Sequence, residues 1–120
     1  MSDQLQEYQL NMAIVRETAD RIIRDFESFG IVIAFSGRAE EAYQELMDQL
    51  SPAIEEMLST NGTKLMQVLY RIDIAEDKLK AAIDRFTELT FAQVISRLII
   101  EREMQKVLTR RIYKSQQENK

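Results

Sequence analysis

Four carboxylates have the spacing that metal chemistry on helices requires. Side chains four residues apart lie on the same helix face, and paired carboxylates can hold Mg²⁺ together with the phosphates of a substrate. Two such pairs lie in segments with helical hydrophobic spacing, so a Mg²⁺-dependent nucleotide hydrolase is one hypothesis for this chain. The residues of this possible acidic site are Glu41, Glu45, Asp73 and Asp77.

The acidic pattern departs from that of a known enzyme class. All-helical nucleoside triphosphate pyrophosphatases pair a Glu-Glu-x-x-Glu helix with a Glu-x-x-Asp helix. This chain instead has Glu40-Glu41-x-x-x-Glu45 and Asp73-x-x-Glu76. Acid-rich faces are also common on solvated helices, and short motifs discriminate poorly. The hydrolase is therefore the third hypothesis, behind two non-catalytic ones.

Basic residues near the end of the chain form a second candidate site. Their main spacing of four residues makes a stripe on one helix face, which could follow the phosphates of RNA or another polyanion. The same cations can instead pair with acidic residues inside the fold or stabilise the C-terminal end of a helix. A sequence pI of about 4.9 favours this second interpretation. The stripe consists of Arg102, Lys106, Arg110, Arg111 and Lys114.

The chain contains no histidine and no cysteine. Ser-His-Asp and Cys-His catalysis, histidine- or cysteine-ligated zinc and histidine-ligated haem are therefore excluded. Di-iron helical bundles are excluded as well, because they need a Glu-x-x-His motif. We expect no cofactor, no metal and no catalytic residue, and disulfides play no part in stabilising the protein.

Length and charge indicate one domain over residues 1–120. The net charge of −4 is unevenly distributed, because residues 97–120 carry +4 and residues 1–96 carry −8. The longest apolar run, residues 29–35 with its glycine included, is much shorter than the roughly 20 residues that a membrane-spanning helix needs. The polar first seven residues do not resemble a signal peptide. We expect a cytoplasmic protein with no membrane contact.

Hydrophobic residues recur at helical spacing along most of the chain. A heptad stripe over residues 5–29 predicts a helix over about residues 4–28, and a second stripe covers residues 65–89. Thr90 and Gln93 form a capping box that opens a last helix, expected to fray after about Tyr113. The fold class is therefore all-α, a bundle of four main helices. The heptad stripes can also pack between chains, so we expect a homo-oligomer, most simply a homodimer.

Glycine, proline and polar residues mark the expected connections. Residues 30–37 are predicted to form an apolar connection pressed on the core, with a two-stranded contact across a dimer as the alternative. Ser36 is expected to cap the next helix. That helix has a break near Pro52, as either a kinked helix or two short ones, and is expected to end at a left-handed Gly62. Residues 115–120 are expected to be a frayed polar tail.

Asp73 lies beside apolar positions, and two interpretations of its charge stay open. It can pair at the surface with Arg71 or Lys80, which contributes little to stability. Alternatively it forms a partly buried ion pair with an arginine of the last helix and fixes the register of two helices.

Three short segments carry a resemblance to known proteins. Residues 69–74 (Leu-Tyr-Arg-Ile-Asp-Ile), 102–107 (Arg-Glu-Met-Gln-Lys-Val) and 111–113 (Arg-Ile-Tyr) resemble a small helical bacterial family of unassigned function. The similarity covers about residues 46–114 and leaves out the first helix. It implies a cytoplasmic helical fold and carries no activity, cofactor or site.

Together these observations favour a non-catalytic helical interaction protein that self-associates. Its partner surface would be either the heptad stripe of the first helix or the basic face of the last helix. Binding of RNA or another polyanion through the basic stripe is the first alternative. The Mg²⁺-dependent hydrolase is the second.

Overall fold

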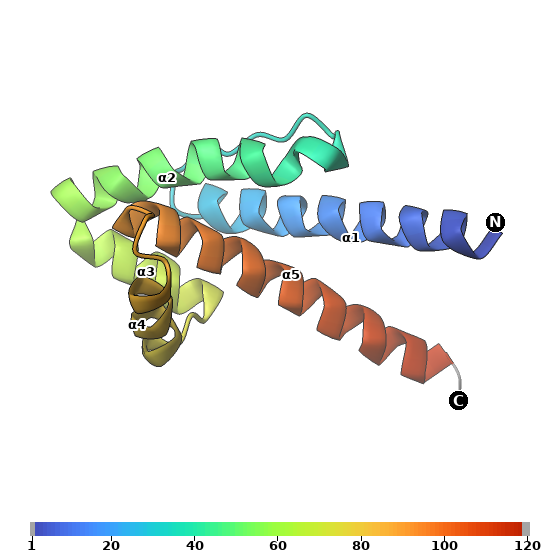
Figure 1. Cartoon of the computed structure of the whole chain (residues 1–120). Helices are drawn as coiled ribbons and strands as arrows, with labels where there is room; N and C mark the ends of the chain where they lie inside the picture. Colours follow the sequence, from blue (N-terminus) through green and yellow to red (C-terminus); the bar gives the residue numbers. More distant parts are fainter. Residues whose placement is uncertain (1, 119–120) are drawn as a thin grey trace.

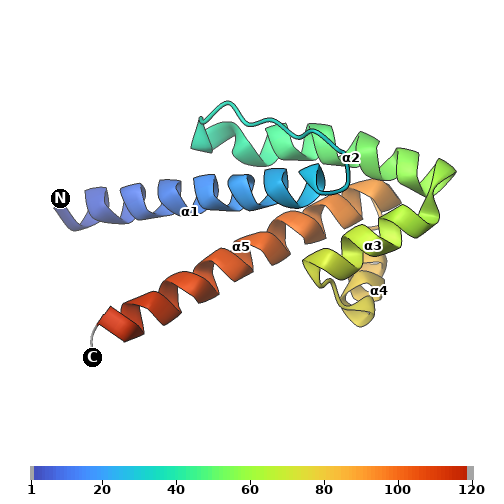
Figure 2. The same cartoon turned by 180° about the vertical axis from the view of Figure 1, so that it is seen from behind.

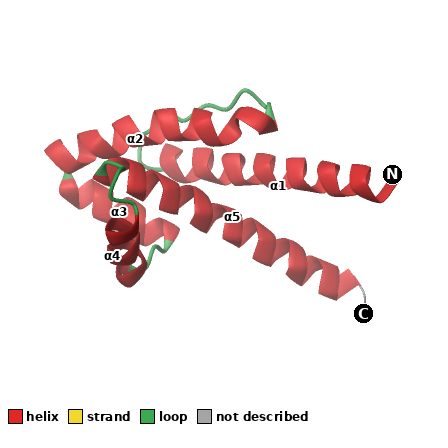
Figure 3. Ribbon diagram, in the orientation of Figure 1, coloured by secondary structure: helices red, strands yellow, loops and turns green. Residues whose placement is uncertain are grey.

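The fold is all-α, as predicted. The computed structural model describes residues 2–118, and within that range every regular element is a helix (Figure 3). No helix in these residues is long and apolar enough to span a membrane. In chain order the elements are α1 (Ser2–Glu27), the single-turn 3-10 helix η1 (Ala39–Glu41), α2 (Ala42–Thr60), α3 (Gly62–Ile72), α4 (Glu76–Arg85) and α5 (Phe91–Glu118).

The hydrophobic core lies where the second half of α1 meets α2, α3 and the first half of α5 (Figure 1). Phe26 of α1, Ile54 of α2, Ile72 of α3 and Ile99 of α5 are all fully buried there. Each comes from the apolar stripe of its own helix, so the helices bury their stripes against one another as a bundle does.

Outside this core, α1 and α5 separate. The two helices run antiparallel, and the first part of α1 and the last part of α5 leave the core as two diverging arms (Figures 1 and 2). Exposure rises along each helix, from 0% at Phe26 to 58% at Leu5 in α1, and from 0% at Ile99 to 59% at Ile112 in α5. The heptad stripe of α1 is therefore buried at one end and open at the other.

The apolar connection predicted over residues 30–37 lies within the segment 28–38 that joins α1 to η1, and this segment runs back along α2 (Figure 1). The side-chain amide of Gln49 accepts a hydrogen bond from the Ala34 N–H and donates one to the Ala34 carbonyl, both at 2.8 Å. Glu45 accepts a hydrogen bond from the Ser36 N–H at 3.0 Å. These side chains take the place of a neighbouring strand, and the connection needs no dimer contact to satisfy these backbone groups.

Three predicted helix boundaries differ in the structure. Ser36 accepts a hydrogen bond from the Arg38 N–H at 3.1 Å and does not cap α2, because η1 intervenes. At Pro52 the alternative of two short helices is wrong, because α2 runs through it as one helix. Gly62 begins α3 and is not left-handed; Asn61 caps α3 by accepting from the Lys64 N–H at 3.1 Å.

The helix predicted over residues 65–89 is divided in two. Asp73 ends α3 in the left-handed conformation with φ 67°, and its N–H donates to the Leu69 and Tyr70 carbonyls. Aspartate tolerates this conformation better than most residues. The chain then turns into α4, which packs on α5, and the Phe86 ring lies 4.3 Å from the Arg97 guanidinium.

Both ends of α5 can be compared with the sequence prediction. The capping box is confirmed, because the Thr90 N–H donates to Gln93 at 2.9 Å and the Gln93 N–H donates to Thr90 at 3.1 Å. The expected fraying after Tyr113 is wrong, since α5 continues to Glu118. The last two residues of the expected polar tail, 119–120, lie outside the described residues.

Candidate functional site

A groove of about 1120 Å³ lies between the diverging parts of α1 and α5. Its walls carry apolar side chains from both helices: Leu10 and Ile14 of α1, and Leu108 and Ile112 of α5. Three of these are open to solvent, with Leu10 47%, Leu108 39% and Ile112 59% exposed, whereas Ile14 is 9% exposed. We call this surface the α1–α5 groove. Apolar side chains gathered in an open groove mark interaction surfaces more often than isolated exposed residues do.

An ion pair crosses the α1–α5 groove. Arg111 of α5 binds Glu17 of α1 through two hydrogen bonds, and the Nε–Oε2 distance is 3.1 Å. Arg110 and Lys114 also line the groove, and neither forms an ion pair with any residue among 2–118. Glu118 is the acidic residue that lines the groove from the same helix, so the α5 wall has a net positive charge.

The arm of α1 that faces this wall carries negative charge. Residues 2–15 of α1 contain two acidic residues, Asp3 and Glu7, and no basic one. Both acidic side chains are exposed. The two arms thus combine an apolar surface with opposite charges.

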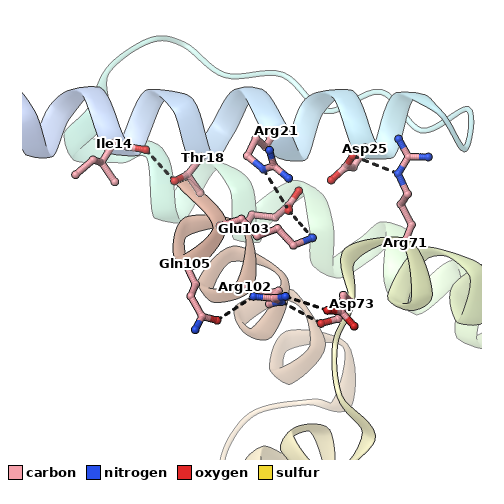
Figure 4. A network of polar contacts seen from close by, with 10 residues as sticks. Ile14, Thr18, Arg21, Asp25, Arg71, Asp73, Arg102, Glu103 and Gln105 are labelled. Carbon is pink, nitrogen blue, oxygen red and sulfur yellow. Dashed lines mark hydrogen bonds and ion pairs between the residues drawn. The ribbon is translucent and has the colours of Figure 1, made fainter. Parts of the chain in front are cut away.

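A buried carboxylate lies where the two helices meet, at the closed end of the groove. Glu103 of α5 is fully buried, with its Oε1 3.7 Å from Nε of Arg21 and 3.4 Å from Nζ of Lys106 (Figure 4). Neither of its carboxylate oxygens accepts a hydrogen bond from residues 2–118, and the buried Nε of Arg21 donates none there. Buried charges without hydrogen bonds are costly.

This environment changes the acidity of Glu103. Burial is the main cause that raises the pKa of Glu103 to about 7, and the neighbouring Asp25 carboxylate raises it further, while Lys106 and Arg21 act in the opposite direction. Asp25 in turn lies 3.7 Å from the Arg71 guanidinium of α3. The charged cluster therefore joins α1, α3 and α5 around one carboxyl group that titrates near neutrality.

The basic stripe of the sequence is largely occupied within the fold. Arg102 pairs with Asp73, Lys106 with Glu103 and Arg111 with Glu17. Three of the five cations thus have intramolecular partners, and only Arg110 and Lys114 have none among residues 2–118. These pairs agree with the alternative expectation from the sequence, in which the cations pair with acidic residues inside the fold.

The four carboxylates of the possible acidic site do not form one site. Glu41 pairs with Arg38 at 2.8 Å, and hydrogen bonds from Ser36 lower the pKa of Glu45 below its ordinary value. Asp73 and Asp77 lie at the α3–α4 connection, away from the start of α2 (Figure 1). Among residues 2–118, no three carboxylates are grouped so that they could hold a metal ion.

Asp73 has the partner proposed for it in the last helix. Arg102 donates from Nη2 to the Asp73 carboxylate at 2.9 Å and from Nε to the Asp73 carbonyl at 3.0 Å (Figure 4). The pair lies nearer to solvent than expected, since the Asp73 side chain is 79% exposed. The surface alternatives are not formed, because Arg71 pairs with Asp25 and Lys80 with Glu76.

Two features of the groove were missed in the sequence. Leu10 lies outside the heptad stripe of α1, but its spacing of four residues from Ile14 places both on one helix face and was a usable signal. Glu103 had a usable signal, because Ile99, Glu103 and Val107 follow one another at intervals of four on the buried face of α5. A charged residue in a core stripe indicates a buried ion pair or a functional group.

Comparisons with known proteins return no relative of this chain: no family model, no curated protein and no solved structure matches it. The resemblance to a helical family of unassigned function therefore stays a prediction.

Proposed function

We propose that this protein is a non-catalytic helical interaction protein, and that its first partner is a second copy of itself, bound in the α1–α5 groove as a homodimer. The observation that carries the proposal is the pair of diverging arms, which leave apolar residues of α1 and α5 exposed on facing walls. A cytoplasmic location, expected from the sequence, is part of this proposal.

A second copy fits because the surface is complementary to itself. In a two-fold dimer each patch meets its counterpart reciprocally, so a contact from α1 to the partner's α5 occurs twice. The acidic α1 arm, with Asp3 and Glu7, suits the wall of the partner's groove that carries Arg110 and Lys114. Complementary charges of this kind set orientation and speed of encounter.

The exposed apolar residues of the groove contribute the free energy of association when they are buried. If the partner's α1 arm lies in the groove, Leu10, Leu108 and Ile112 leave water in both copies. Burial of apolar area contributes about 25 cal/mol for each Å² removed from water. Association then completes the burial that the bundle leaves unfinished at this end of the molecule.

Polyanion binding through the basic stripe has less support. Counterion release scales with the number of phosphates that a protein neutralises. Arg110 and Lys114 are the two stripe residues with no ion pair among residues 2–118, and they alone make a small phosphate-binding surface.

Sedimentation velocity across a range of protein concentrations tests the proposal. The unmodified chain is expected to self-associate, and the double variant Leu108→Asn/Ile112→Asn is expected to sediment as a monomer. Met66→Asn/Tyr70→Asn is the matched control, because these two residues are 66% and 89% exposed on α3, away from the groove. A monomeric unmodified chain, or a groove variant that associates as the control does, would overturn the proposal.

A further inference from the structure

We propose that Glu103 is a proton-controlled latch at the closed end of the α1–α5 groove. When it is neutral it keeps α1 and α5 packed together at the root of the two arms, which is the packed form, and when it is charged it lets the arms open further. This inference rests on the proposed function, because it concerns regulation of the same groove.

The position of Glu103 is the first argument. It lies on α5 four residues before Val107, which lines the groove, and its partner Arg21 on α1 lines the groove as well. The point at which α1 and α5 begin to separate is therefore held by a carboxyl group. A change in the charge of that group acts at the root of both arms.

The missing hydrogen bonds are the second argument. Both oxygens of Glu103 and the Nε of Arg21 are buried without a hydrogen-bond partner among residues 2–118. The packed arrangement therefore solvates a charged carboxylate poorly. A neutral carboxyl group loses much less by burial. Opening of the arms would admit water to these same atoms.

Other charged groups near Glu103 modify the latch without replacing it. Arg21 and Asp25 face it from α1 and Lys106 from its own helix, while Arg71 of α3 contacts Asp25. From α2 no cation lies within ion-pair distance of Glu103 in the described residues. Further out, the Glu17–Arg111 pair crosses the groove and must separate when the arms open.

The direction in which pH shifts the equilibrium between the packed and open forms follows from proton linkage. Burial and the Asp25 carboxylate raise the pKa of Glu103 from 4.5 to about 7 in the packed form, and a hydrated carboxyl group in the open form has an ordinary value. The packed form therefore binds the proton more tightly. The ratio of packed to open chains falls about tenfold for each pH unit between these two values and is constant above them. Self-association through the packed groove weakens over the same range.

The absence of native cysteine allows the opening to be measured directly. Spin labels on Gln9→Cys and Gln116→Cys, two exposed positions on the arms, report the distance between α1 and α5. Labelled chains are diluted into unlabelled chains so that only distances within one chain are read. From pH 5 to pH 8 we expect the population to shift to longer distances. With Glu103→Gln in addition, we expect one short distance at every pH.

The control Glu101→Gln removes a neighbouring exposed carboxylate and should leave the pH shift unchanged. Distances that do not move with pH, or that move equally in the Glu103→Gln chain, would overturn the latch. The dissociation constant, measured at the same pH values, should rise at least tenfold in the unmodified chain and stay level with Glu103→Gln. If no chain associates at any pH, self-association is wrong while the distance shift still supports the latch. Association that is equal at every pH would overturn the regulatory role.

Discussion

Arg102 and Asp73 join the last helix to the end of α3 through two hydrogen bonds, one to the carboxylate of Asp73 and one to its backbone carbonyl. The aspartate has the left-handed conformation that ends α3, with φ 67°. A single arginine therefore holds both the side chain and the strained backbone of the residue that turns the chain into α4. The turn and the ion pair stabilise each other.

Replacement of Asp73 by alanine should lower the free energy of unfolding by about 1–2 kcal/mol, because alanine adopts the left-handed conformation at a cost of this size. Urea denaturation checks the value. Asp73→Gly removes the same ion pair but accepts the backbone conformation, so it should lose less. Asp84→Ala, an exposed aspartate on α4, is the control. Unchanged stability in Asp73→Ala would show that the turn needs neither the pair nor the aspartate.

Gln49 should be the residue that holds the connection between α1 and α2. Gln49→Ala removes both hydrogen bonds to Ala34, and we expect a loss of about 1–2 kcal/mol. Hydrogen exchange gives the more specific measurement, because the Ala34 amide should lose its protection while amides of the core helices keep theirs. Gln44→Ala, which removes a hydrogen bond to Asp48 on the outside of α2, is the control. An Ala34 amide that stays protected would show that the connection is held without Gln49, by packing and by the Glu45–Ser36 hydrogen bond.

The pH dependence of stability should carry the signature of Glu103. Its pKa is raised from 4.5 to about 7 in the folded protein, so the folded state binds more protons than the unfolded state between these values. The free energy of unfolding therefore falls as the pH rises through this window, by up to about 3 kcal/mol from this residue, and is level above it. Chemical denaturation at several pH values measures the slope.

Glu103→Gln removes only this contribution, so the difference between the two chains isolates it from all other titrating groups. The difference should change with pH between 5 and 7 and be constant at pH 8 and above. Glu101→Gln should run parallel to the unmodified chain. A constant difference across the whole range would mean that Glu103 titrates normally in the folded protein.

The bundle could be predicted from the sequence where local signals agree. The heptad stripe of residues 5–29 and the Thr90–Gln93 capping box are local patterns, and both correspond to the observed helices. The break at Asp73 could not be predicted in the same way. Apolar spacing continues across it through Ile72 and Leu79, and no glycine or proline marks the turn. Contact with Arg102, 29 residues away, helps to hold this conformation.

The α1–α5 groove could not be predicted either, because it too depends on contacts between helices that are distant in the sequence. A heptad stripe predicts that a helix has a buried face, but not how much of its length finds a partner. Leu5 and Phe26 are equivalent in the pattern, yet one is 58% exposed and the other 0%. The angle between α1 and α5 decides this, and it depends on the packing of all the core helices.

Reciprocal self-association through the two arms is tested most directly by a charge exchange. One variant carries Asp3→Lys/Glu7→Lys and the other Arg110→Glu/Lys114→Glu. Each variant alone brings like charges together at both contacts and should sediment as a monomer. An equimolar mixture restores opposite charges at both contacts, so it should form a heterodimer. Variants that each dimerise as the unmodified chain does, or a mixture that stays monomeric, would contradict the account.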